Sequence, residues 1–167
     1  MKTEIKYGVI FAAIVIVYVM IEHLLGLNTT RHDIGQYTRL AGVLVPIIGI
    51  FFGIKAKRDQ DRNGILTFGQ GVKTGFLVAV IQTTITTLWF WLYGSLINPQ
   101  FLGSMLEFER TKMIAAGTPV SDITAKINRM KTLYSFPTLQ IFQEVIGIVY
   151  GVIVAMIFSA FLRRKAH

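Results

Sequence analysis

Four long apolar segments dominate the sequence and limit what it can fold into. They lie at about residues 7–27, 37–54, 72–97 and 138–162. A helix needs roughly 20 predominantly apolar residues to cross the hydrocarbon core of a bilayer. Three of the segments meet this length. The second does so only if its apolar run extends back through Arg39, whose side chain would then reach the interface; the alternative is a buried or re-entrant segment.

The composition agrees with a membrane protein. Hydrophobic residues make up 53% of the chain and charged residues 16%, whereas soluble domains carry about 25% charged residues. The absence of cysteine excludes disulfides, thiol catalysis and thiolate metal sites. The first apolar segment is long and no small-x-small cleavage site follows it, so we expect a membrane helix rather than a signal peptide. We therefore predict an all-α, polytopic membrane helix bundle, with residues 1–167 as one integral membrane domain.

The basic residues flank the apolar segments, and this placement predicts a topology. The net charge is +8, which in a soluble protein would suggest nucleic-acid binding, but here the positive-inside rule explains it better. Ten of the 17 Lys and Arg residues fall on one side: Lys2, Lys6, Lys55, Lys57, Arg58, Arg62, Lys73, Arg163, Arg164 and Lys165. We expect both termini in the cytoplasm and no nucleic-acid partner.

Residues 98–136 carry the pattern of two amphipathic helices. Asn98-Pro99 is typical of a helix cap and first helical position, and Gly117 and Pro119 end the first helix. A second apolar stripe runs from Val120 to Tyr134 at spacings of three and four residues. We predict an extracytoplasmic helical hairpin. Its apolar faces either pack on each other or lie in the headgroups, or they dock a partner helix.

The stretch "GILTFGQGVKTGF" superficially resembles a phosphate-binding loop. Such a loop requires Gly immediately before the Lys-Thr pair, after a strand; here Val72 precedes Lys73 and the preceding segment is a charged loop. We therefore predict no nucleotide site. Small residues spaced by four instead favour close helix packing in lipid. The glycines predicted to pack in this way are Gly49, Gly53, Gly71, Gly75, Gly147 and Gly151.

A few polar and ionisable residues fall at membrane depth, where they are functional candidates. The predicted polar intramembrane cluster comprises Glu22, His23, Arg39, Gln140 and Glu144. One interpretation is an ion pair of Arg39 with Glu144 or with Glu22. A second is a proton, ion or small-solute site with Glu144 as the titrating group. A metal site is disfavoured, because Glu22 and His23 are adjacent and point about 100° apart on a helix.

The segment "FFGIKAKRDQDRNGILTFGQGVKTGFLVAV" resembles the hallmark of a bacterial membrane family, domain of unknown function 4199, known mainly from Bacteroidota. The segments "INPQFLGSMLEF" and "FQEVIGIVYGVIVAMIFSAFLRRK" also resemble this family, so the resemblance covers essentially the whole chain. Gly71 stands where the family more usually has Ala. The resemblance implies a four-helix protein of the bacterial inner membrane. It implies no activity and assigns no catalytic or ligand residues.

Two hypotheses for function remain open. The first is a non-catalytic membrane subunit or scaffold, with the lipid bilayer and a membrane protein as its partners. The alternative is a small transporter or channel that must be a homo-oligomer, with Glu144 as its ion-binding group. We find no nucleophile–base pair, phosphate loop or metal triad in the sequence, so we expect neither an enzyme nor a bound cofactor.

Overall fold

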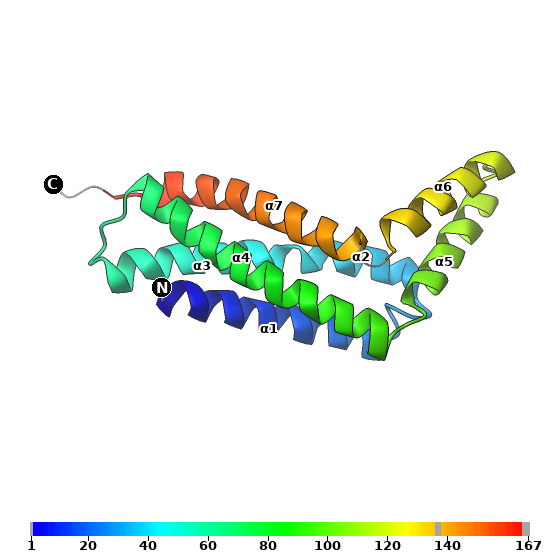
Figure 1. The fold of residues 1–167 in the computed structure, drawn as a ribbon, viewed down its shortest axis with the longest axis horizontal. Helices are drawn as coiled ribbons and strands as arrows, with labels where there is room; N and C mark the ends of the chain where they lie inside the picture. Colours follow the sequence, from blue (N-terminus) through cyan, green and yellow to red (C-terminus); the bar gives the residue numbers. More distant parts are fainter. Residues whose placement is uncertain (1, 136–137, 165–167) are drawn as a thin grey trace.

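The computed structural model describes residues 2–135 and 138–164, apart from the side chains of Thr138 and Gln140. These residues are almost entirely helical (Figure 1). In chain order the elements are α1 (Lys2–Leu24), α2 (His32–Gly42), α3 (Leu44–Asp61), α4 (Phe68–Leu92), the π-helical turn η1 (Tyr93–Ile97), α5 (Phe101–Ala115), α6 (Val120–Leu133) and α7 (Thr138–Leu162). The described residues contain no β-strand, and the prediction of an all-α fold is confirmed.

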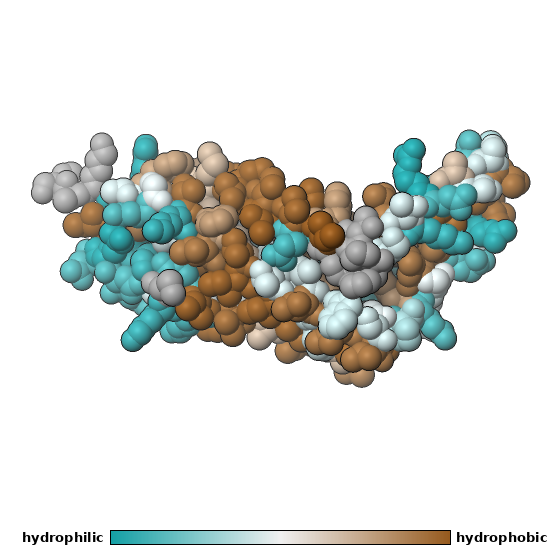
Figure 2. Space-filling view, viewed as in Figure 1, coloured by the Kyte–Doolittle hydropathy of each residue, from teal (hydrophilic) through white to brown (hydrophobic). Residues whose placement is uncertain are grey.

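Four helical stretches are long and apolar enough to cross a membrane. They are Lys2–Leu24, His32–Asp61, Phe68–Ile97 and Ile141–Leu162. Figure 2 shows their apolar side chains as a hydrophobic band across the bundle, with hydrophilic residues gathered at both ends. A bundle that exposes its apolar residues in a band and its charges at the ends matches the layers of a bilayer. The predicted polytopic membrane bundle is therefore confirmed.

The second spanning stretch is longer than the sequence pattern predicts and contains a break. Helices α2 and α3 follow one another along the bundle (Figure 1), separated only by Val43. Pro46 explains the break, because it has no N–H to donate to the carbonyl of Gly42 and its ring crowds that carbonyl. The amide of Val43 accordingly bonds to the carbonyl of Leu40, 3.2 Å away. Residues 32–61 thus run the length of the bundle and form no re-entrant segment.

Small residues pack α4 against α7 along a line that we call the α4–α7 seam. Its four antiparallel layers pair Gly71 with Ser159, Gly75 with Ala155, Ala79 with Gly151, and Thr83 with Gly147. A Cβ atom added to any of these four glycines would approach its partner closer than 3.0 Å. The helix backbones therefore approach more closely here than any larger residue would allow, as is typical of helix packing in lipid.

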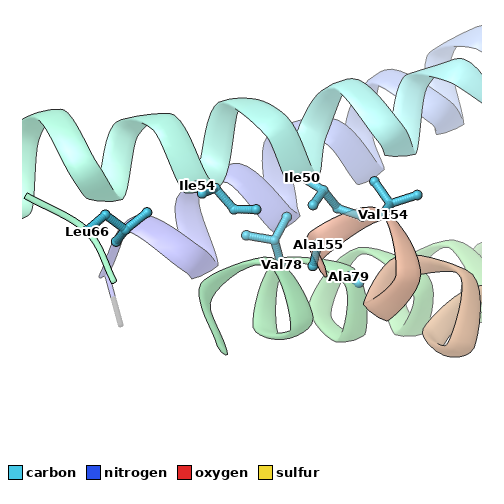
Figure 3. Packing of buried hydrophobic residues seen from close by; sticks show 7 residues of the cluster. All are labelled: Ile50, Ile54, Leu66, Val78, Ala79, Val154 and Ala155. Carbon is cyan, nitrogen blue, oxygen red and sulfur yellow. The ribbon is translucent and has the colours of Figure 1, made fainter. Parts of the chain in front are cut away.

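The other two predicted packing glycines lie on α3. A Cβ atom at Gly49 would come within 2.7 Å of Phe11, and one at Gly53 within 2.8 Å of Val78. Helix α3 thus packs closely on both α1 and α4. The buried core lies beside these contacts (Figure 3) and consists of Ile50, Ile54, Leu66, Val78, Ala79, Val154 and Ala155.

Polar contacts close the end of the bundle where α1 begins and α7 ends, which we call the terminal end. Lys57 forms ion pairs with Glu4 and Asp61, both at 3.0 Å. Leu66 and Arg164 exchange two backbone hydrogen bonds, of 3.0 and 2.9 Å. The Lys57–Glu4 pair joins α3 to α1, and the Lys57–Asp61 pair lies within α3. The backbone bonds join the loop before α4 to the residues after α7.

Helices α5 and α6 form a hairpin at the opposite end, which we call the hairpin end. The hairpin projects from the bundle (Figure 1), and Lys126 and Glu109 bridge its two helices at 3.1 Å. Asn98 does not cap the first helix as the sequence predicts. Helix α5 begins only at Phe101, because η1 prolongs α4 as far as Ile97. Phe136, the last residue of the predicted hairpin, lies outside the described residues.

Candidate functional site

A network of polar side chains joins α1, α2 and η1 at the hairpin end, and Asn28 is at its centre. The Asn28 amide donates to the Glu22 carboxylate over 3.4 Å and accepts from the Arg39 guanidinium over 3.3 Å. Glu22 is only 3% exposed. Arg39 therefore reaches Glu22 through an amide, and the direct ion pair predicted between them is absent.

Asn98 and Tyr93 complete this hairpin-end network. The Asn98 amide donates to the backbone carbonyl of Asn28 over 2.9 Å and to the Tyr93 hydroxyl over 3.1 Å. The same hydroxyl lies 3.0 Å from His23 Nδ1. The hydroxyl accepts from Asn98, and the direction of its bond with His23 Nδ1 depends on the tautomer of the imidazole. The network thus joins the loop after α1 to η1, where the chain leaves the bundle for the hairpin.

Glu144 lies apart from this network, on the outward side of α7 beside α4. The Thr84 hydroxyl donates a 2.8 Å hydrogen bond to its carboxylate. Among the residues that the structure describes, no Lys, Arg or His forms an ion pair with it. Figure 2 shows a small hydrophilic patch within the hydrophobic band where α4 and α7 diverge toward the hairpin end.

Gln143 adjoins Glu144 and faces inward. Its side-chain oxygen is buried and accepts no hydrogen bond from the described residues. The side chain of Gln140, also predicted in the cluster, lies outside the described residues. Glu144 and Gln143 therefore form a polar stretch of α7 next to Gly147, the last small residue of the α4–α7 seam toward the hairpin end.

The structure thus divides the predicted cluster into two. Glu22, His23 and Arg39 belong to the hairpin-end network, whereas Glu144 contacts α4. No ion pair of Arg39 with Glu144 forms among the described residues; Arg39 instead lies 5.9 Å from the centre of the Phe101 ring. Within the described part of the chain, no group of three or more His, Cys, Asp or Glu residues is placed to hold a metal ion.

Sequence reasoning missed Asn28 and assigned Asn98 a different role. Asn28 follows Gly26, whose backbone adopts a positive φ of 75°, and a turn of this kind favours Asn nearby. That signal predicts a turn but not the partners that the Asn28 amide binds. The contacts appear only when the loop after α1 meets η1 in the folded chain.

Comparison with known proteins gives a single result. The family described as "Protein of unknown function (DUF4199)" matches residues 6–164, which is nearly the whole chain. No curated protein and no solved structure shows significant similarity to it. The family match agrees with the resemblance seen in the sequence, and it adds no catalytic or binding residue to those described above.

Proposed function

The chain belongs to the DUF4199 family of proteins of unknown function, and from its structure we propose that it is a non-catalytic subunit or scaffold of the bacterial inner membrane. In this role a transmembrane helix of a different membrane protein packs across α4 and α7 at Glu144. The hairpin lies outside the cytoplasm and both termini lie inside it. The positive-inside rule supports this orientation, because the terminal end carries most of the basic residues of the short loops and tails.

The observation that carries the proposal is the position of the Glu144 carboxylate. Its neighbours Ile141 and Val145 are 63% and 54% exposed on the same helix, so this part of α7 faces the lipid or a partner. Glu144 lies six residues into the 25-residue helix α7, so an ionised carboxylate there costs less than the about 2.5–3.5 kcal/mol of the bilayer centre. One hydroxyl from Thr84 offsets only part of that cost, and a partner that covers Glu144 would offset the rest.

Charge complementarity indicates what the partner carries at this depth. A carboxylate without an ion pair favours a Lys or Arg side chain, which forms charge-assisted hydrogen bonds with it. Arg39 of a second copy is a poor candidate, because it is already bonded to Asn28 and packed on the Phe101 ring. Two copies related by a twofold axis through this surface would bring two Glu144 carboxylates together. A different membrane protein with a basic residue fits better.

The same carboxylate supports the alternative of a small oligomeric transporter or channel. In that case Glu144 would line a pathway between copies of the chain and would bind the transported proton or cation. The two functions differ in what covers Glu144, which is a partner helix in one and an aqueous path in the other.

Site-specific crosslinking from native membranes tests the proposal. The chain contains no cysteine, so a single Cys at Ile141 or Val145 reports only on this surface. We expect it to crosslink to one membrane protein, at a helix that carries Lys or Arg at matching depth. Glu144→Gln should abolish the crosslink, whereas Glu107→Gln on the exposed hairpin should not. Charge reversal on both sides, with Glu144→Lys here and Glu in the partner, should restore it.

Other results would overturn the proposal. Crosslinks only between copies of this chain, together with a pH-dependent flux in vesicles that Glu144→Gln abolishes, would establish the transporter instead. A chain that purifies alone from its own membrane in a mild detergent, and whose Cys variants crosslink to nothing, would exclude both functions for this surface.

A further inference from the structure

An apolar groove runs along the outward side of α4 and α7 near the terminal end, away from Glu144. It has a volume of about 490 Å³. Its lining residues are Phe68, Gly69, Val72, Lys73, Phe76, Val152 and Met156. Small-molecule sites commonly measure about 300–1,000 Å³. The groove is therefore large enough for part of a lipid, and it lies on a surface that the membrane covers.

Lys73 is the single charged residue in this lining. It is exposed and forms no ion pair with any described residue. Lys73 lies five residues after Phe68, or roughly 7.5 Å along the helix from its start at 1.5 Å per residue. From that depth the Lys stem can lie along apolar surface while its ammonium group reaches the headgroup level.

Gly69 leaves the part of the groove beside Lys73 open. A Cβ atom added there would meet no atom within 4 Å, unlike the glycines of the α4–α7 seam two and six residues further on. The absence of a side chain at Gly69 therefore creates space beside Lys73 without serving the packing of α4 on α7. This space adjoins the polar end of the groove, where a headgroup would continue into its chain.

The charge of the surrounding surface favours an anionic occupant. The described residues at the terminal end carry Lys2, Lys6, Lys55, Lys57, Arg58, Arg62, Lys73, Arg163 and Arg164 against only Glu4, Asp59 and Asp61. A Lys at the headgroup itself contributes about a fivefold gain in affinity for an anionic lipid, and the other cations attract anionic lipid to this end without selecting the groove.

We propose that the groove binds one anionic phospholipid, with its headgroup phosphate on Lys73 and an acyl chain along Phe76, Val152 and Met156. Val152 lies eight residues, or roughly 12 Å, along α7 from Glu144. The site combines a shallow, open apolar groove with a cation that has no ion pair among the described residues.

Native mass spectrometry of the purified full chain tests this inference. The probes are dioleoylphosphatidylglycerol and dioleoylphosphatidylcholine, which share their chains and differ in headgroup charge. We expect one phosphatidylglycerol to bind about fivefold more tightly than phosphatidylcholine. Lys73→Gln should remove that preference. Lys55→Gln, which deletes an exposed charge at the same end but outside the groove, should retain it.

A second pair of variants tests the groove itself. Gly69→Leu places a side chain in the open space and should weaken binding of both lipids, whereas Gly103→Leu, at an equally open position on α5, should not. Circular dichroism confirms that each variant is folded. Equal binding of the two lipids, equal losses in Lys73→Gln and Lys55→Gln, or unchanged binding in folded Gly69→Leu would each overturn the proposal. Should Gly69→Leu fail to fold, Val72→Trp, which also fills the groove, takes its place.

Discussion

Replacing Gly75 by Ala should destabilise the bundle, although Ala is the better helix former. The added methyl group would collide with the Cβ atom of Ala155 and lie 3.2 Å from its Cα atom. Because the obstacle includes backbone, a rotamer change cannot relieve it, and α4 and α7 must move apart. Optimal carbon–carbon contacts lie at about 3.5–4.0 Å, so the Cα atom alone requires a separation of roughly 0.3–0.8 Å and the closer Cβ atom requires more.

The size of the effect follows from the contacts that this separation weakens. A gap of about 0.5–1 Å removes a quarter to a half of a dispersion contact worth about 0.1–0.2 kcal/mol. Some 20–30 atom pairs across the neighbouring layers of the seam would then lose about 1–2 kcal/mol in total. Overpacked cores generally lose about 1–3 kcal/mol. Ala regains about 1 kcal/mol of this in helix propensity. We therefore expect the free energy of unfolding of Gly75→Ala to lie about 1–2 kcal/mol below that of a Gly→Ala variant at an open helix position.

Reversible unfolding in mixed micelles of SDS and a mild detergent, followed by circular dichroism, measures this change. The control is Gly103→Ala on α5, where the new methyl group meets no atom within 4 Å. Ala exceeds Gly in helix propensity by about 1 kcal/mol, so the control should be as stable as the unmodified chain or more stable. The reasoning would be refuted if Gly75→Ala were stabilised to the same extent as Gly103→Ala.

Two further changes test the contacts that close each end of the bundle. Asn98→Ala should cost about 1–3 kcal/mol in the same assay, because it leaves the buried carbonyl of Asn28 without its donor; a loss below 0.5 kcal/mol would show that water replaces the amide. Lys57→Met should destabilise the chain by less than the about 3–5 kcal/mol typical of a fully buried pair, because Lys57 remains 15% exposed beside Glu4. Lys55→Met, at an exposed position two residues away, should stay within about 0.5 kcal/mol. Equal effects of the two Lys variants would contradict a role for the ion pair.

The spanning helices were predictable because lipid leaves few alternatives for a long apolar segment. Helix α1 begins at Lys2, before the first apolar segment, because Glu4 pairs with Lys57 and the Thr3 hydroxyl bonds to Asp61 at 2.8 Å. Contacts with α3 thus stabilise a polar first turn that the hydropathy of the segment alone does not indicate.

The sequence predicts which helices carry the polar residues but not the direction of each side chain around its helix. Glu144 contacts α4, whereas Arg39 contacts the loop after α1. The spacing of the glycines indicates part of the direction of Glu144 around α7. Glu144 precedes Gly147 by three residues, which places it at the edge of the face that packs on α4. Which residue of α4 it meets depends on the antiparallel register of the two helices, and only the folded structure sets that register.

The α4–α7 seam also determines the order in which the fold can be completed during synthesis. Ala79 and Gly151 touch in the finished bundle but are about 70 residues apart in the chain, with the whole hairpin between them. At about 5–20 residues per second, the ribosome makes that interval in roughly 4–14 s. During this time the small-residue face of α4 is in the membrane without its partner. A chain interrupted before α7 would leave this face bare, and the faces of two such chains could then pair with each other.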